Sequence, residues 1–421
     1  MAGLSTINEM RFPLVVRALN KCGALLDGAL IRHGRADEFL AAAKKQTQLS
    51  DFGGTEFVEP LSRFLESAHR EAQLNLVGKL ALRSDVSRLL RTRLLMVHDR
   101  AQNPEIARQE IHQPLFIVGL PRTGTTLLHA LLSADATHRA PFTWEVMQPS
   151  PPSDEQRAQR IQRTARDLAW MRYLAPDFGR VHAIGAELPQ ECVSLMSATF
   201  LSDQFDTMYN VPSYRNWFVR QNLQAAYRFH RRFLQHLQFA RPGKRWILKA
   251  PAHMGSVAGL LTAYPDALFV QTHRAPLRSI TSVSSLVTML RRVFSDVVDP
   301  VKIGREALTY WAEMLERFMQ ERERRDLAVF DLAYTDLQHD PIAAVQQLYQ
   351  YFDWPFSRDT QARMREVLAA QANELRTFHR YELAAFGLRL EEEQRYFGEY
   401  CQRFGVCTHQ TAFRGVPAAA C

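Results

Sequence analysis

The stretch at residues 114–128, PLFIVGLPRTGTTLL, constrains the fold more than any other part of the chain. It begins with a short apolar run, passes through a turn containing Gly119, Pro121 and Gly124, and continues with hydroxyl residues and leucines. The pattern predicts a buried strand, a tight loop and a helix. The amides at the start of a helix placed in this way can bind an anion such as phosphate.

The loop keeps the two glycines of a nucleotide triphosphate loop, G-x-x-x-x-G-K-[ST], but lacks its lysine, because Thr125 stands at that position. The backbone cradle is therefore retained without the group that reaches the outer phosphates. We expect one phosphate, or a phosphate that carries a transferring group, to bind here without an obligatory metal. The amides of Gly124 to Leu127 and the side chain of Arg122 are the predicted contacts; a Gly/Pro turn without a ligand is the alternative.

Four short apolar runs alternate with helical segments from residue 114 onward. They are LFIVG at 115–119, RWILK at 245–249, LFVQT at 268–272 and LAVFDL at 327–332. Strands buried on both faces have this composition, and their alternation with helices predicts a parallel sheet. We therefore predict an α/β fold with a P-loop-like, doubly wound parallel sheet flanked by helices.

The remaining segments are mainly helical by pattern. Residues 1–110 show helical periodicity and strong helix formers, which predicts a helical N-terminal layer. Residues 111–405 would form the α/β domain with a helical insertion at about 145–240, and residues 406–421 a tail. The insertion is rich in aromatic residues, and we expect most of them in the core and some in an acceptor site, because the insertion follows the phosphate loop.

A second anion site is indicated where the run at 268–272 ends. Arg274 follows this predicted strand, and Ser282 lies eight residues later, two turns into the predicted helix LRSITSVSSLV. Both side chains can converge on one anion at the edge where open α/β sheets bind ligands. Together with the first loop, the pattern describes a ligand with two separated phosphates.

Five segments together resemble the superfamily of sulfotransferases that use PAPS, 3′-phosphoadenosine 5′-phosphosulfate. They are GLPRTGTTLL, LKAPAHM, THRAPLRSITSVSSL, AYTDLQHDP and HRYELAAFGL. The chain is most similar to a large group of bacterial sulfotransferase-family proteins that also resembles the tyrosylprotein enzymes, and the resemblance covers about residues 110–405. It implies that Arg274 and Ser282 hold the 3′-phosphate. The loop residues that would hold the 5′-phosphosulfate are Arg122, Thr123, Gly124, Thr125 and Thr126.

The resemblance also suggests a base for the acceptor hydroxyl. Glu145, 23 residues beyond Arg122, resembles the catalytic glutamate of the tyrosylprotein enzymes in position, and burial in a cleft can raise the pKa of such a carboxyl toward a useful value. A structural salt bridge is the alternative role for Glu145. The cytosolic members use a histidine instead, which makes His253 the competing candidate.

Further roles follow from the same resemblance. Lys249, at the end of the run RWILK, matches the family lysine that stabilises the leaving group, and Arg122 would share this task. A surface charge at a strand end is the alternative for Lys249. His379 and Tyr381 belong to a late family segment that can fold over the nucleotide, so they are candidates for contact with PAPS.

These observations predict an enzyme that moves a sulfuryl group in line from PAPS to an acceptor hydroxyl and releases PAP, adenosine 3′,5′-bisphosphate. One alternative is a P-loop kinase or nucleotidase, for which the lysine is missing. Another is a non-catalytic nucleotide-binding protein, which would have no need of Glu145 and Lys249. The acceptor stays open: the aromatic insertion favours an apolar or aromatic alcohol, lipid or glycolipid, and a peptide tyrosine stays compatible.

Composition limits the remaining possibilities. The net charge of +8 favours anionic ligands, but no nucleic-acid-binding signature accompanies it, so we predict no nucleic-acid partner. No apolar run reaches the roughly 18 residues of a membrane span, and Arg17 and Lys21 interrupt the N-terminal apolar positions as in an amphipathic helix. The five cysteines lack ligand or disulfide spacing, which favours the cytoplasm, and we predict no metal. Formation of a homo-oligomer is left open.

Overall fold

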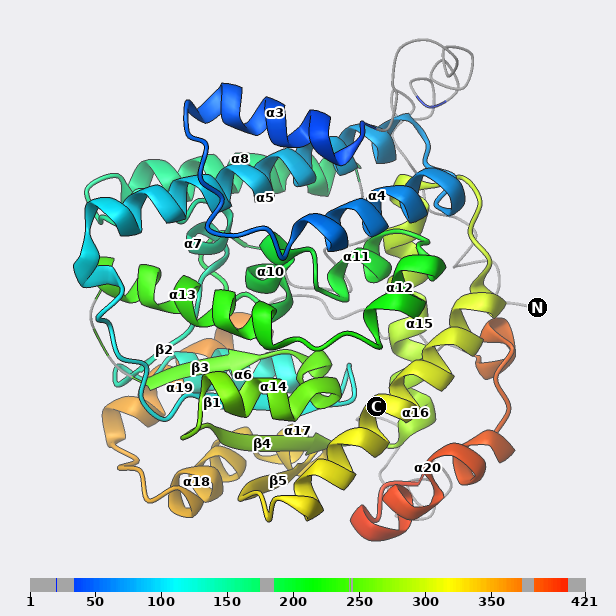
Figure 1. Cartoon of the computed structure of the whole chain (residues 1–421). Coiled ribbons are helices and arrows are strands. Elements are labelled where there is room, and N and C mark those ends of the chain that lie inside the picture. Colours follow the sequence, from blue (N-terminus) through cyan, green and yellow to red (C-terminus); the bar gives the residue numbers. More distant parts are fainter. Residues whose placement is uncertain are drawn as a thin grey trace.

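A parallel sheet of five strands lies at the centre of the α/β part of the chain (Figure 1). The computed structural model describes residue 20 and residues 34–174, 185–241, 243, 245–372 and 382–407. The strands are β1 (Leu115–Gly119), β2 (His138–Arg139), β3 (Arg245–Lys249), β4 (Leu268–His273) and β5 (Val329–Ala333). Their order in the sheet is β2-β3-β1-β4-β5, and all neighbours run parallel.

The strand order changes direction at β1. The chain first adds β2 and β3 on one side of β1, and then crosses to add β4 and β5 on the other side. Sheets of this kind bind ligands in the crevice at the carboxyl ends of the strands, where the order reverses. The loop after Gly119, the end of β3 at Lys249 and the end of β4 at His273 all belong to this edge.

Apolar side chains of β1 supply two cores, because successive residues of a strand point to opposite faces. Leu115 and Ile117 pack in the smaller core with the helices on one face of the sheet. Phe116 and Val118 belong to the larger core on the other face. The helices that contribute to the smaller core are α6 (Thr125–Ser133), α17 (Tyr334–His339), α18 (Pro341–Tyr351) and α19 (Arg358–Ala372).

The described part of the N-terminal region is helical and lies over the insertion (Figure 1). Helix α4 buries Leu61, Phe64 and Leu65, spaced as one face of an amphipathic helix. The ring of Phe64 lies with its centroid 4.4 Å from that of Phe205 in the insertion, so the two regions share the larger core. The elements are α3 (Ala36–Thr47), α4 (Val58–Glu71), α5 (Leu76–Gln102) and η1 (Pro104–Ile106).

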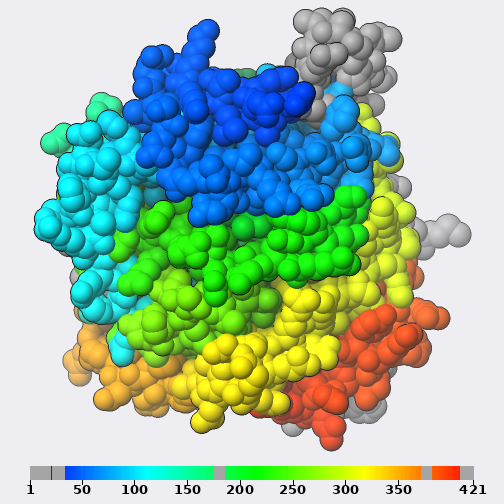
Figure 2. Space-filling model, in the orientation of Figure 1, coloured from blue at the N-terminus to red at the C-terminus, as the bar shows by residue number. Residues whose placement is uncertain are grey.

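Helices of the insertion lie between this layer and the sheet. Figure 2 shows the blue N-terminal layer, the green insertion and the yellow-green segment after β3 as successive bands on one face of the molecule. The insertion contains α7 (Thr143–Met147), α8 (Arg157–Leu174), α10 (Cys192–Met196), η2 (Ser197–Thr199), α11 (Gln204–Met208), α12 (Pro212–Phe218) and α13 (Gln224–Ala240). The later elements are η3 (Pro251–Ser256), α14 (Val257–Ala263), α15 (Pro276–Phe294), α16 (Pro300–Arg324), η4 (Leu383–Phe386) and α20 (Glu391–Phe404).

The predicted fold class is confirmed: a doubly wound parallel sheet flanked by helices, with a helical N-terminal layer and a helical insertion. The four predicted strands correspond to β1, β3, β4 and β5, with ends that differ by at most two residues. The short β2 was missed because His138 and Arg139 carry no apolar signal; its pairing with β3 defines it. The predicted N-terminal amphipathic helix and the tail from residue 408 lie outside the described residues.

Candidate active site

The loop after β1 is held in one conformation by close backbone contacts. Gly124 has a φ of 88°, and a Cβ atom placed on it would lie 2.9 Å from the side chain of Leu337 and 3.0 Å from that of Tyr334. The hydroxyl of Thr123 donates to the carbonyl oxygen of Leu120 at 2.6 Å and lies 2.5 Å from the hydroxyl of Thr272 on β4. The Thr123 side chain therefore helps to hold the loop in place.

Helix α6 begins directly after this loop, with Gly124 as its N-cap residue. No described side chain caps its first turn, so the amides of Thr125, Thr126 and Leu127 have no partner of that kind. These amides and the helix dipole favour an anion at this end. The loop and the start of α6 thus have the backbone arrangement that the predicted phosphate cradle requires.

The second predicted anion site lies against the first. Arg122 donates from Nε to the hydroxyl of Ser282 on α15 at 3.2 Å. Arg274, which follows β4, donates from Nη1 to the carbonyl oxygen of Arg122 at 2.7 Å. The guanidinium of Arg274 also stacks on the ring of Tyr334, 4.3 Å from its centroid, which fixes the plane of the charged group. The structure therefore brings Arg122, Arg274 and Ser282 together at the edge of the sheet.

Lys249 lies at the end of β3 beside the phosphate loop. Only 3% of its side chain is exposed, and its ammonium lies 3.4 Å from the hydroxyl of Thr126. It forms an ion pair with Glu191, the N-cap residue of α10 in the insertion. A buried ammonium needs a counterion, and Glu191 supplies it here. The sequence analysis selected Lys249 but missed Glu191.

Glu145, the predicted base, lies near the start of α7 and has several polar partners of its own. It is the third residue of α7, and its carboxylate accepts the backbone N–H of Phe142 at 3.0 Å. The same carboxylate pairs with Arg139 at 2.8 Å and lies 3.9 Å from Arg241, while only 2% of the Glu145 side chain is exposed. Its described contacts therefore close the start of a helix and neutralise buried arginines. None of them involves Arg122 or Lys249.

His253, the competing base, is buried in η3. Its Nδ1 lies 2.8 Å from the hydroxyl of Tyr227, and its Nε2 has no hydrogen-bond partner among the described residues. Burial lowers the pKa of His253 well below its ordinary value, and the neighbouring His230 lowers it further. The imidazole is therefore neutral and accepts a proton reluctantly.

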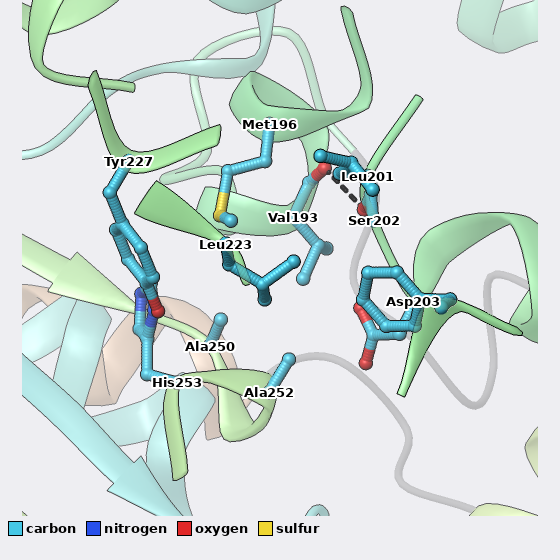
Figure 3. Close-up of a pocket in the computed structure, with 11 residues that line it drawn as sticks. Val193, Met196, Leu201, Ser202, Asp203, Leu223, Tyr227, Ala250, Ala252 and His253 are labelled. Carbon is cyan, nitrogen blue, oxygen red and sulfur yellow. Dashed lines mark hydrogen bonds between the residues drawn. The ribbon is translucent and has the colours of Figure 1, made fainter. Parts of the chain in front are cut away.

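An apolar recess opens beside the end of β3 (Figure 3). Its cavity volume is about 10 Å³, which is room for about one water molecule or one hydroxyl group. Ala250 and Ala252, which come directly after Lys249, line it together with residues of the insertion. The lining residues are Val193, Met196, Leu201, Ser202, Asp203, Phe218, Leu223, Tyr227, Ala250, Ala252 and His253. Among these lining residues Asp203 is the one acid, and the sequence analysis did not single it out.

Most aromatic residues of the insertion are buried in the larger core, among them Phe200, Phe205 and Tyr214. Phe218 and Tyr227 belong to the same core and also line the recess, whereas Trp170 and Tyr173 are exposed. The predicted nucleotide contacts His379 and Tyr381 lie outside the described residues. Within the described ranges, no helix is long and apolar enough to cross a membrane, and no group of three or more His, Cys, Asp or Glu side chains is arranged to hold a metal ion.

Comparison with known sequences agrees with this geometry. A sequence model of the sulfotransferase family matches residues 114–358. The chain is 26% identical over 314 residues to the omega-hydroxy-beta-dihydromenaquinone-9 sulfotransferase Stf3 of Mycobacterium bovis, and the match covers 70% of this chain and 76% of that protein. The protein of the same name from Mycobacterium tuberculosis gives the same values.

Two solved structures are similar over nearly the whole chain. Sulfotransferase STF1 from Mycobacterium tuberculosis superposes with a TM-score of 0.77 at 31% identity. The match covers 88% of this chain and 100% of the STF1 chain. Sulfotransferase STF9 from Mycobacterium avium has a TM-score of 0.78 at 24% identity, covers 90% of this chain and 98% of its own length, and supports the fold. The region matched by the family model contains the phosphate loop, Lys249, Arg274 and Ser282, and the chain belongs to the sulfotransferase family.

Proposed function

We propose that this sulfotransferase takes the sulfuryl group from PAPS, transfers it to the hydroxyl of an apolar acceptor and releases PAP. The observation that carries the proposal is the contact of Arg122 with both Ser282 and Arg274 beside the open start of α6. Two groups of anion-binding residues lie side by side there. A ligand with phosphates at both ends of a nucleoside fits such an arrangement better than a triphosphate does.

The residues divide between the two ends of PAPS. The amides of Thr125 and Thr126 and the side chains of Arg122 and Lys249 would hold the 5′-phosphosulfate. The side chains of Arg274 and Ser282 would hold the 3′-phosphate, since a guanidinium binds phosphate oxygens through paired N–H donors. Glycine at position 124 suits a tight phosphate loop, because a Cβ there would lie 2.9 Å from the side chain of Leu337 and 3.0 Å from that of Tyr334.

Charge stabilisation is the main chemical contribution of these residues. Sulfuryl transfer resembles phosphoryl transfer, in which an acceptor oxygen attacks in line and the enzyme positions the groups and neutralises developing charge. Lys249 lies beside the hydroxyl of Thr126 at the start of α6, so its ammonium can neutralise the departing phosphate. Arg122 would share this charge.

The acceptor hydroxyl also requires a base. Glu145 is the prediction from family resemblance, but its contacts with Arg139 and the amide of Phe142 favour a structural role. His253 lines the recess, yet its lowered pKa makes it a weak proton acceptor. The base role of either residue is tested by substitution.

The acceptor class is proposed from the recess beside Lys249. Its lining is mostly aliphatic and aromatic, which favours an apolar alcohol over a charged one. The name of the mycobacterial relative, which acts on an omega-hydroxy menaquinone, supports an apolar acceptor for this chain as well. Transfer of label from ³⁵S-PAPS should be faster to a polyprenyl alcohol than to a glucoside of equal concentration; the reverse preference would contradict this acceptor class.

Binding of PAP tests the donor. Calorimetry in EDTA should show micromolar PAP binding by the wild type and binding about 10- to 100-fold weaker by Arg274→Ala, because a charged hydrogen bond is lost. Arg363→Ala removes an exposed arginine of α19 and serves as the matched control. Absence of PAP binding, together with Mg²⁺-dependent ATP binding, would contradict the proposal and favour a P-loop kinase.

A further inference from the structure

Asp203 stands at a helix start without capping it. It is the N-cap residue of α11, yet its carboxylate accepts no hydrogen bond from the helix amides. Aspartate at this position usually caps, and two other N-cap aspartates of this chain do so: Asp299 accepts from the amides of Val301 and Lys302, and Asp340 from the amide of Ala343. The Asp203 carboxylate is therefore not used to build its own helix.

No described basic side chain pairs with Asp203 either. The nearby Asp206, in contrast, pairs with Arg215 at 3.5 Å and with Arg291 at 3.2 Å, so it has the counterions of a structural acid. Asp203 instead lines the apolar recess (Figure 3), and its side chain is partly exposed. Its environment is that of a group kept available to a ligand.

Part of the lining of the recess comes from residues that lie close in the chain to the proposed site of sulfuryl transfer. Ala250 and Ala252 follow Lys249 in the chain, and Val193 of the wall is two residues from Glu191, the partner of Lys249. The negative charge of Glu191 also acts on Asp203. An acceptor hydroxyl that enters the recess therefore lies beside Asp203, next to the strand end that carries Lys249.

We propose that Asp203 is the base that takes the proton of the acceptor hydroxyl, and that Glu191 is a positioning residue that holds Lys249. This assignment rests on the proposed function. In the step, the acceptor O–H bond breaks as its proton passes to the Asp203 carboxylate. A new bond forms between the acceptor oxygen and sulfur, while the bond from sulfur to the 5′-phosphate oxygen breaks. PAP leaves with that electron pair, and Asp203 then returns its proton to solvent.

The electrostatic surroundings suit this role. Burial raises the pKa of the Asp203 carboxyl to about 7, and the charges of Glu191 and Asp206 add to the shift. A base whose pKa lies near the working pH accepts a proton most effectively while still being available in its ionised form. The other titratable groups around it are the hydroxyls of Tyr214, Tyr227 and Tyr310, whose pKa values are all raised, and the neutral imidazole of His253.

Asp203→Asn tests the proposal, with Asp299→Asn as the matched control at a capping aspartate. The first measurement is PAP affinity, which should be unchanged in both variants. The second is transfer from ³⁵S-PAPS to phenol and to 4-nitrophenol, whose hydroxyl is mostly ionised at pH 8. Loss of a general base lowers turnover by about 100- to 10,000-fold. We expect a loss in this range for Asp203→Asn with phenol, a loss below about tenfold with 4-nitrophenol, and no loss for Asp299→Asn.

The dependence of kcat/KM on pH distinguishes a base from a residue with a structural role, because loss of a structural residue would leave the shape of this profile unchanged. The acidic limb of log kcat/KM, which falls below about pH 7 in the wild type, should disappear in Asp203→Asn. If the wild type uses neither phenol, release of labelled sulfate to water replaces transfer as the readout, with the same expected loss. Equal losses with both acceptors, or phenol transfer within about threefold of wild type, would overturn the role of Asp203. Failure of the wild type to bind PAP would instead overturn the proposed function.

Glu191→Gln separates positioning from proton transfer. Because Glu191 holds Lys249, its loss should lower kcat with both phenols by a similar factor and leave the acidic limb in place. A loss confined to phenol, accompanied by disappearance of the acidic limb, would assign the base to Glu191 and exclude Asp203.

Discussion

The buried Lys249 and the partly exposed Glu191 form an ion pair that joins the end of β3 to the start of α10. One partner belongs to the sheet edge that would hold the donor, and the other to the insertion that lines the recess. The ammonium also lies within 3.4 Å of the Thr126 hydroxyl, at the first turn of α6. This pair therefore connects the donor side of the site to its acceptor side.

Replacement of Lys249 by alanine should separate catalysis from binding. We expect Lys249→Ala to lower turnover by about 100- to 1,000-fold, because a group that stabilises transition-state charge is removed. The affinity for PAP should change less, since Arg122, Arg274 and the loop amides remain. Single-turnover kinetics and calorimetry measure the two effects. Lys45→Ala, on the exposed face of α3, is the control, and equal losses in turnover and PAP affinity would contradict a catalytic role.

Glycine at position 124 should be required for binding. Gly124→Ala introduces a Cβ at a φ of 88° within 3.0 Å of the side chains of both Leu337 and Tyr334, so the loop or these side chains must shift, and the strained φ adds to this effect. Gly405→Ala is a matched control, because its φ is 64° and nothing lies within 4 Å of the added Cβ. We expect both variants to lose about 1 kcal/mol of stability from the backbone conformation alone, and only Gly124→Ala to lose PAP binding. Retention of PAP affinity in Gly124→Ala would argue against the cradle.

We expect the main contribution of Glu145 to be to the stability of the folded chain. Its carboxylate is buried against Arg139, and removal of one partner of a buried ion pair costs roughly 3–5 kcal/mol. We expect Glu145→Gln to approach the lower part of this range, because the amide retains part of the hydrogen bonding. Urea unfolding of Glu145→Gln and Arg139→Gln should show similar losses. A variant Glu145→Gln of normal stability that binds PAP and does not transfer would restore Glu145 as the base.

Asp203 should make stability depend on pH. Its pKa is about 7 in the folded chain against an ordinary value of 3.8, because burial and the charges of Glu191 and Asp206 disfavour ionisation. As pH rises, the unfolded chain therefore releases this proton before the folded chain does. The free energy of unfolding consequently falls as pH rises from about 4 to about 7. Asp203→Asn removes this loss, so its melting temperature relative to wild type should rise across that range and level off above it. Parallel melting curves at every pH would contradict the raised pKa.

The sheet was predictable because its strands are buried on both faces. LFIVG and the first three residues of LFVQT are apolar because they supply two cores, and this composition is visible without the structure. The positions of Lys249, Arg274 and the phosphate loop follow, because residues after parallel strands meet at one edge. The strand β2 has no such signal, since its two residues are defined by pairing with Arg245 and Trp246 alone.

The residues on the acceptor side of the site were harder to predict from the sequence, because they come from segments that are far apart in the chain. Glu191 reaches Lys249 across 58 positions in the chain, and no local pattern indicates that contact. Asp203 lines the recess together with Phe218 and Leu223, which come from later segments of the insertion. For Glu145 a local signal did exist: an acid three residues after the position that begins a helix can accept that residue's amide, which is the contact with Phe142.

The recess and the donor cradle are made from different parts of the chain. Strand ends, the loop after β1 and α15 supply the donor residues, whereas the apolar walls come from the short insertion helices. Side chains such as Met196, Leu201, Phe218 and Leu223 can therefore change in size without moving the groups that would hold PAPS. Evolution can retarget such an enzyme to a new alcohol by substituting a few wall positions, and a designer can restrict a mutant library to the same four.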